Sequence, residues 1–287
     1  MVTLAYEERA LTFECAGERL VGIVAAPHDA RVGLVIVVGG PQYRAGSHRQ
    51  YVLLARRLAS AGVAVMRFDY RGLGDATGAM IPFEEAVADV AAAMDAFAAA
   101  CPSLERIVLW GLCDAASLAL LYWHATRDRR VAGLVLADPW ITSEQEFAQS
   151  QARHYLARPF QLAFWKKLVS GGVDVKGALA DVKSVLGTLA RRGSGAAAAA
   201  APFQQRMSQG LADFHDPVLL VLSGDLTARD FRQYCETHAE WQNLIARDNV
   251  AHGNIPDANH TFAGAAARGE VERLTAEWLA ANVTGRS

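Results

Sequence analysis

Short, continuous apolar runs recur along the chain, and segments with helical spacing of apolar residues separate them. Such runs are typical of strands that are buried on both faces of a parallel sheet. They cover residues 32–38, 63–68, 107–110, 131–137 and 217–222. Helical periodicity is clear in residues 48–58 and 83–99 and again after residue 115. This alternation predicts right-handed βαβ units and a mainly parallel, twisted sheet flanked by helices.

The two ends of the chain carry weaker signals. Residues 11–14 and 20–25 lie on either side of Gly17 and Glu18 and predict an antiparallel hairpin. Three further elements are expected near the other end: a helix at 231–241, a weaker strand at 244–250 and a final helix at 271–280.

The alternation stops between residues 140 and 215, where amphipathic segments rich in aromatic residues take its place. We expect a helical cap there, inserted between two strands of a core domain formed by residues 1–139 and 216–287. Within the cap, residues 191–202 (RRGSGAAAAAAP) predict a flexible loop, because Gly, Ser and Ala offer little surface to bury.

The sharpest local signal is the turn between the apolar run at 107–110 and the helical segment that follows. Gly111, Leu112 and Cys113 alone are available to reverse the chain, so the Cys113 side chain is expected above the sheet, as in the G-x-S-x-G nucleophile elbow. Gly111 and Ala115 are small, as the close contact of strand and helix requires. The helix N-terminus favours a thiolate. The plainer alternative is a buried cysteine that acts as a small hydrophobic residue.

Three chemically suited side chains each follow a predicted strand or its loop. Ligands in open α/β sheets gather outside the carboxyl ends of the strands, so Cys113, Asp225 and His260 can converge there. Their order along the chain, nucleophile, acid, histidine, is that of α/β-hydrolases. His260 would take the thiol proton, and Asp225 would orient the imidazole. Because Asp225 immediately follows Gly224, Asp138 and, after it, Asp230 remain alternatives for the acid.

An oxyanion hole needs two donors. The backbone N–H of Asp114 is expected to be one. The other is assigned to Gly40, because the stretch VGGPQ at 38–42 resembles the H-G-G-P-G loop of proline-iminopeptidase-like hydrolases. The Gln42 side chain could contact substrate instead, or be an ordinary loop amide. The loop DYRGLGD at 69–75 resembles a D-x-R-G-x-G-x-S loop of the same superfamily, and we expect Arg71 to tie it down.

Composition narrows the class of protein. The 287 residues are 52% hydrophobic, with a formal net charge of −2, so nucleic acid is not an expected partner. Four widely spaced cysteines show no metal-ligand spacing and predict a reduced, cytoplasmic protein. No signal peptide or membrane-spanning run is evident, and no G-x-G-x-x-G motif opens a helix. No cofactor and no metal are therefore expected.

Several motifs together, GGPQYRAGSHRQ, FDYRGLGD, WGLCDAAS, SGDLTARDF and NHTF, resemble the exosortase A system-associated hydrolase type 1 family. These are bacterial proteins of the α/β-hydrolase superfamily that are linked to genes for protein sorting and exopolysaccharide production. The resemblance covers nearly the whole chain, the cap least clearly. It implies the α/β-hydrolase fold and a cysteine hydrolase.

Three functions follow from these residues. The first is a cysteine-dependent hydrolase that cleaves a small-molecule ester, thioester or lactone through an acyl-enzyme. The second is an acyltransferase that passes the same acyl group to a sugar hydroxyl or an amine. The third is a non-catalytic protein that keeps the fold for binding. The oligomeric state and the identity of the acyl group do not follow from the sequence.

Overall fold

The computed structural model describes residues 5–40, 42–142 and 201–285. Eight strands form one sheet in the order β1-β2-β4-β3-β5-β6-β7-β8. The pairs β1/β2 and β2/β4 are antiparallel, and all the other neighbours are parallel. The strands are β1 Tyr6–Cys15, β2 Glu18–Pro27, β3 Val32–Val37, β4 Ala64–Asp69, β5 Arg106–Leu112, β6 Val131–Ala137, β7 Val218–Ser223 and β8 Val250–Ile255.

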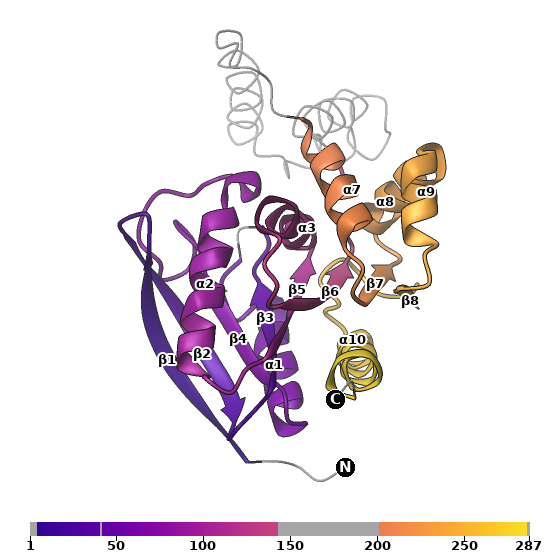
Figure 1. The fold of residues 1–287 in the computed structure, drawn as a ribbon. Coiled ribbons are helices and arrows are strands. Elements are labelled where there is room, and N and C mark those ends of the chain that lie inside the picture. Colours follow the sequence, from indigo (N-terminus) through magenta and orange to yellow (C-terminus); the bar gives the residue numbers. More distant parts are fainter. Residues whose placement is uncertain (1–4, 41, 143–200, 286–287) are drawn as a thin grey trace, which may run out of the picture. The chain divides into compact units, whose positions relative to one another are not determined.

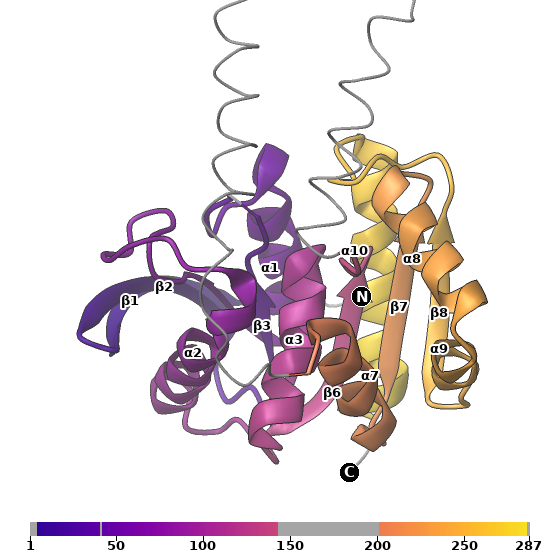
Figure 2. The ribbon, with the colours of Figure 1, turned by 90° about the horizontal axis from the view of Figure 1, so that it is seen from above.

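Helices cover both faces of the sheet (Figures 1 and 2). One face carries α1 and α10, and the other carries α2, α3 and α7. The helices are α1 Gln50–Ser60, α2 Val87–Ala100, α3 Asp114–Thr126, α7 Phe203–Asp213, α8 Leu226–Thr237, α9 Ala239–Ile245 and α10 Ala265–Leu279, with short 3-10 turns at Ser47–Arg49 and Phe83–Glu85. The architecture is the α/β-hydrolase fold, which confirms the predicted fold class.

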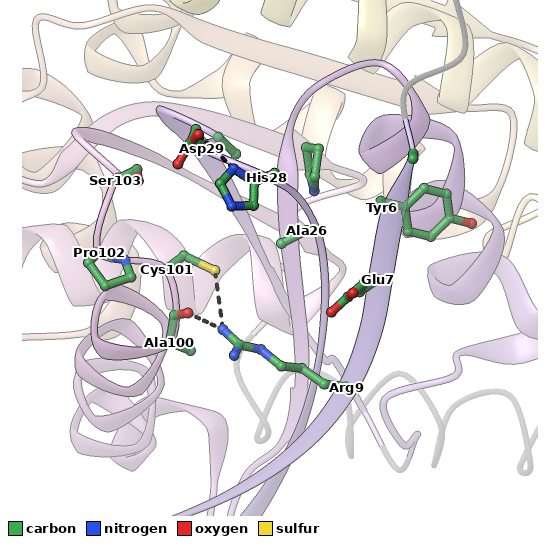
Figure 3. A pocket seen from close by; sticks show the side chains of 13 residues that line it. Tyr6, Glu7, Arg9, Ala26, His28, Asp29, Ala100, Cys101, Pro102 and Ser103 are labelled. Carbon is green, nitrogen blue, oxygen red and sulfur yellow. Dashed lines mark hydrogen bonds and ion pairs between the residues drawn. The ribbon is translucent and has the colours of Figure 1, made fainter.

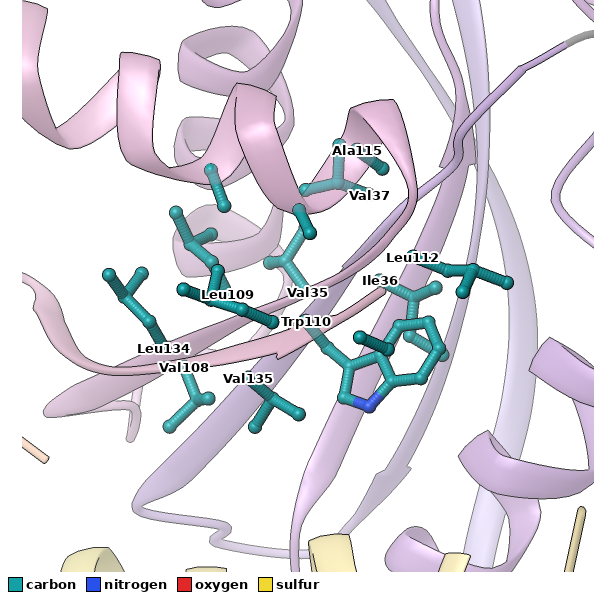
Figure 4. Packing of buried hydrophobic residues seen from close by; sticks show 14 of the residues in the cluster. Val35, Ile36, Val37, Val108, Leu109, Trp110, Leu112, Ala115, Leu134 and Val135 are labelled. Atoms are coloured by element: carbon teal, nitrogen blue, oxygen red, sulfur yellow. The ribbon is translucent and has the colours of Figure 1, made fainter. Parts of the chain in front are cut away.

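Strand β5 lies at the centre of the core because both its faces are covered (Figure 4). On one side, Trp110 packs edge-on against Tyr51 of α1, with ring centroids 5.7 Å apart, and its Nε1 donates to Thr275 Oγ1 of α10 at 3.4 Å. Every residue of β3, β4 and β7 is buried. This burial is what the continuous apolar runs predict for a parallel sheet.

The last third of the chain departs from the predicted elements. The expected strand at 244–250 is wrong: Leu244 and Ile245 end helix α9, and β8 begins at Val250. Strand β8 forms the edge of the sheet, and its exposed His252 and Asn254 break up the apolar run that marks the inner strands. Because one side of an edge strand contacts solvent, its sequence lacks the continuous apolar run that predicts a buried strand.

The predicted cap falls mostly outside the described residues, so the division into core and cap stays a prediction. Helix α7 lies within the range expected for the cap and packs against α3 of the sheet domain. Residues 143–200, which include most of the predicted flexible loop at 191–202, are not described.

Candidate functional site

The chain reverses at Cys113, between the end of β5 and the start of α3. Cys113 has φ 64° and ψ −128°, a backbone conformation that residues other than glycine rarely adopt. Backbone hydrogen bonds hold the bend: its N–H donates to Ala137 O at 2.9 Å, and its carbonyl accepts from Ala116 N at 3.0 Å and Trp140 N at 3.2 Å. Strain of this kind costs on the order of 1–3 kcal/mol and clusters at functional sites.

Gly111 makes the bend possible, as the sequence predicted. A Cβ on Gly111 would lie 2.4 Å from the backbone carbonyl atoms of Ala115 and 2.5 Å from Ala116 N. No side chain fits in that space. The first turn of α3 can therefore pack directly on the end of β5, which lifts Cys113 to the carboxyl edge of the sheet.

The surroundings of the Cys113 sulfur favour its thiol form. Burial, followed by the Asp114 carboxylate, raises its pKa to about 12, and Asp138 and Asp225 contribute in the same direction. The N–H of Asp114 opposes this shift, but it does not outweigh burial and three carboxylates. The helix N-terminus thus acts on the sulfur in the expected direction, but burial and the carboxylates outweigh it, so a base is needed to take the proton if Cys113 is to act as a nucleophile.

His260 faces Asp138. Its Nδ1 lies 3.5 Å from Asp138 Oδ2, and the Asp138 side chain is fully buried. Asp138 follows β6 with φ 41°. It accepts a 2.8 Å hydrogen bond from Ser223 N and a 2.6 Å bond from Ser223 Oγ, at the end of neighbouring β7. These donors fix the carboxylate and leave it directed at the imidazole.

Asp225 takes a different position. It precedes α8, is half-buried, and its N–H donates to Ser223 Oγ at 3.1 Å. Among the described residues, His260 pairs with Asp138 and not with Asp225 or Asp230. Asp225 nevertheless lies near enough to the Cys113 sulfur to raise its pKa. Asp138 and Asp225 therefore both lie at this edge, whereas Asp230 is exposed. The histidine pairs with Asp138, which the sequence offered only as an alternative acid.

The loop that carries His260 is fixed on both sides. Gly224 lies so close to it that a Cβ there would be 1.9 Å from Pro256 O, and Gly224 N donates to Ala258 O at 3.2 Å. After the histidine, Asn259 Oδ1 accepts from Ala263 N at 3.0 Å. No hydrogen bond joins the Cys113 sulfur to the His260 ring in the part of the chain that the structure describes.

The predicted oxyanion donor Gly40 is already engaged. Its N–H donates to both carboxylate oxygens of Asp114, at 2.8 and 2.9 Å. Gly39 permits this approach, because a Cβ there would lie 2.4 Å from Asp114 Oδ1. From the sequence, only the backbone N–H of Asp114 was expected in the site, and its side chain was given no role.

Ion pairs fix the loop after Gly40 and the loop after β4. Arg44 pairs with fully buried Asp69 and with Asp75, and Asp69 Oδ1 also accepts from Arg44 N at 2.6 Å. In the loop after β4, the Arg71 guanidinium pairs with buried Asp89 at 2.7 Å, which confirms its predicted role as a tie. Buried charge-assisted contacts of this kind are stronger than neutral hydrogen bonds.

Gln42 makes contacts within its own loop. Its side-chain oxygen accepts from Ser47 N at 3.1 Å and from Ser47 Oγ at 3.4 Å. The side-chain oxygen of Gln42 thus has hydrogen-bond partners within the protein and does not need a substrate to supply one. They match the loop-amide alternative, and a contact with substrate stays a prediction.

A pocket of about 440 Å³ lies at the opposite edge of the sheet (Figure 3). Its lining includes His28, Asp29 and residues 100–103, which precede β3 and β5, whereas Cys113 follows β5. Arg9 extends into it, donates to Ala100 O and lies 4.0 Å from the Cys101 sulfur. Size alone therefore does not identify the reactive site.

Within the described ranges, no cluster of three or more His, Cys, Asp or Glu side chains could hold a metal ion. In the same ranges, no helix combines the length and the apolar character needed to cross a bilayer.

Comparison with known structures supports the fold. An esterase from Pyrococcus furiosus, Pf2001, superposes with a TM-score of 0.68 at 15% identity, covering 96% of this chain and 91% of the other. Est1E from Butyrivibrio proteoclasticus, with ferulic acid bound, has a TM-score of 0.62 at 15% identity over 95% and 99% of the chains. A hydrolase structure from Agrobacterium vitis S4, described as putative, has a TM-score of 0.61 at 18% identity over 96% and 99%.

No curated protein matches the sequence significantly. The family model described as serine aminopeptidase, S33, matches residues 30–225, which is more than half of the chain. The match includes Cys113 and Asp138 and ends before His260. The family description names a serine, whereas this chain has a cysteine at the bend. With this match and its eight-stranded sheet, the chain belongs to the serine aminopeptidase S33 family of α/β-hydrolases.

Proposed function

We propose that the protein is a hydrolase that cleaves an ester, thioester or lactone through an acyl-enzyme on Cys113. The observation that carries this proposal is the strained bend at Cys113, which lies at the same edge of the sheet as the His260–Asp138 pair. Esterases among the structural neighbours, one with ferulic acid bound, make esters of small carboxylic acids the first substrates to test.

The roles follow from the geometry. His260 Nδ1 faces Asp138, which leaves Nε2 free to accept the thiol proton. The sulfur attacks the carbonyl carbon, and the alcohol leaves with the proton that His260 held. Water then attacks the thioester, His260 takes a proton from that water, and Cys113 departs and is reprotonated. Hydrogen bonds to the nucleophile are often long before substrate binds, so His260 is expected to close on the sulfur in the complex.

We assign the acid of this triad to Asp138 in preference to Asp225. Asp138 is the acid in position to orient the imidazole, because Ser223 fixes its carboxylate and His260 Nδ1 lies 3.5 Å from Oδ2, a distance that must shorten for a hydrogen bond to form. An orienting acid holds the useful tautomer and stabilises the imidazolium ion. Asp225 contributes negative charge near the sulfur but shows no pairing with the ring.

Within the S33 family, we group this chain with the exosortase A system-associated hydrolases on the motifs around Cys113 and His260. That subfamily, like a cytoplasmic location and the acyltransferase alternative, stays a prediction. Product analysis with and without a polyol acceptor separates hydrolysis from acyl transfer.

Cys113→Ala is the direct test of the proposal. Turnover of p-nitrophenyl acetate and butyrate is expected to fall at least about 1,000-fold, because the variant has no nucleophile. Cys101→Ala is the matched control, since Cys101 lies at the opposite edge of the sheet, and it should keep wild-type turnover. Wild-type turnover in Cys113→Ala would reject the proposed nucleophile.

A further inference from the structure

The Asp114 carboxylate is bound to the N–H of Gly40, one of the two donors expected for the oxyanion hole. It accepts from Gly40 N through both oxygens, at 2.8 and 2.9 Å. Burial raises the pKa of Asp114, and the Gly40 N–H is the largest of the contacts that lower it. One of the two donors that the sequence assigned to the oxyanion hole, the Gly40 N–H, is therefore engaged by an internal carboxylate.

Asp114 directly follows the nucleophile in the chain and is partly buried. Asp114 is one of the charges that raise the pKa of the Cys113 thiol, of Tyr51 in α1 and of Tyr70 in the loop after β4. His260, from the loop after β8, in turn stabilises the charged form of Asp114. The carboxylate is thus near enough to groups on four segments, the nucleophile among them, to interact with them electrostatically.

We infer that Asp114 is an internal inhibitor of the oxyanion hole, which a substrate carbonyl must displace from the Gly40 N–H before Cys113 can be acylated. This inference rests on the proposed function. The N–H of Gly40 cannot bind a carboxylate with two oxygens and also point fully at a developing oxyanion. Acylation is slowed by the work of breaking a charge-assisted hydrogen bond.

Three variants separate the contact with Gly40 from the charge near the sulfur. Asp114→Ala removes both the acceptor and the charge. Asp114→Asn keeps the shape and one acceptor oxygen but removes the charge. Asp225→Asn is the matched control, because Asp225 also raises the pKa of Cys113, while the carboxylate bonded to Gly40 N is that of Asp114.

Two rates are measured for each protein. Acylation by p-nitrophenyl acetate, followed as the nitrophenol burst, requires the oxyanion hole. Alkylation of Cys113 by iodoacetamide requires only the ionised sulfur. The ratio of the two rates therefore cancels changes in the pKa of the thiol and reports on the oxyanion hole.

We expect the ratio to rise about tenfold in Asp114→Ala and less in Asp114→Asn, the size expected for losing one charge-assisted hydrogen bond. It should stay within about twofold of wild type in Asp225→Asn. An unchanged or lower ratio in Asp114→Ala, in a variant whose melting temperature matches wild type, overturns the inference. If acylation instead persists in Cys113→Ala, the proposed function itself fails, so the two failures are distinguishable.

A second measurement needs no catalysis. In protein labelled with ¹⁵N-glycine, the Gly40 amide is expected far downfield and should move as Asp114 titrates. The same amide should lose that shift in Asp114→Ala and keep it in Asp225→Asn. A Gly40 amide that does not respond to Asp114→Ala contradicts the contact and the inference with it.

Discussion

The two edges of the parallel sheet differ in how they use charge. At the amino edge, the ion pairs His28–Asp29 and Arg31–Glu105 are exposed to solvent, and His28 and Asp29 line a pocket of about 440 Å³. At the carboxyl edge, Asp69 and Asp138 are fully buried, and both Cys113 and Asp138 have positive φ. Exposed pairs contribute little, whereas burying a carboxylate is costly unless it is fully hydrogen-bonded.

Buried charge, more than backbone strain or the volume of a pocket, distinguishes the carboxyl edge from the amino edge. The pocket at the amino edge has no buried acid in its lining, although Asp29 there also has a positive φ of 58°. The carboxyl edge combines a cysteine in a rare conformation with an imidazole and three carboxylates around it. Substitutions at the two edges should therefore differ in their effect on activity.

Asp138→Asn should lower kcat/KM for p-nitrophenyl esters by at least about 100-fold, because the imidazole loses its orienting charge. Asp225→Asn should lower it less than about tenfold. Steady-state kinetics of the two variants compares them directly. A larger loss in Asp225→Asn than in Asp138→Asn would restore Asp225 as the acid of the triad.

Gly111→Ala should destabilise the protein by about 2–4 kcal/mol, because its Cβ would overlap the backbone of Ala115. Gly269 in α10 is the matched control, since a Cβ there meets no atom within 4 Å. Gly269→Ala should leave stability unchanged or raise it by about 0.5–1 kcal/mol. Urea unfolding measures both. Equal stabilities for the two variants would show that the bend tolerates a side chain.

Alkylation of Cys113 by iodoacetamide should be slow at pH 7 and rise about tenfold per pH unit up to pH 11, because the thiolate is the reactive form. The sign follows from the pKa, which is raised to about 12, so the thiolate fraction is still increasing throughout this range. Cys113→Ala supplies the background from the other cysteines. A plateau near neutral pH would instead indicate a thiolate–imidazolium pair.

Arg9→Ala should change kcat/KM for esters by less than about twofold, since Arg9 lies at the amino edge and contacts Ala100 and Cys101. The same assays measure this variant. A tenfold loss would assign catalytic importance to the pocket in Figure 3 and remove the contrast between the two edges.

The inner strands and the bend could be predicted from sequence because their signals are local. Continuous apolar runs identify strands that are buried on both faces, and a glycine two residues before a cysteine marks a tight turn. Strand β8 lacked such a signal, because His252 and Asn254 of this edge strand are exposed. Helix α9, which precedes β8, ends in Leu244 and Ile245, two adjacent apolar residues that resemble the first residues of a buried strand.

The pairing of acid with histidine could not be read from the sequence. Asp138 follows β6 and Asp225 follows β7, and these neighbouring strands end at the same edge. Ser223 decides between them, because it directs both its N–H and its hydroxyl at Asp138. The contact of Asp114 with Gly40 was missed for a similar reason: it joins residues 74 positions apart through a side chain that the turn motif treats as variable.

Strands β1 and β8 also determine how the sheet meets neighbouring molecules. Their outer sides are the places where an additional strand from another chain could pair. Glu7, Glu8 and Arg9 in β1 are charged and largely exposed, and β8 presents a histidine and an asparagine to solvent. Such borders discourage intermolecular β-pairing, so a concentrated preparation should resist fibril formation through its sheet.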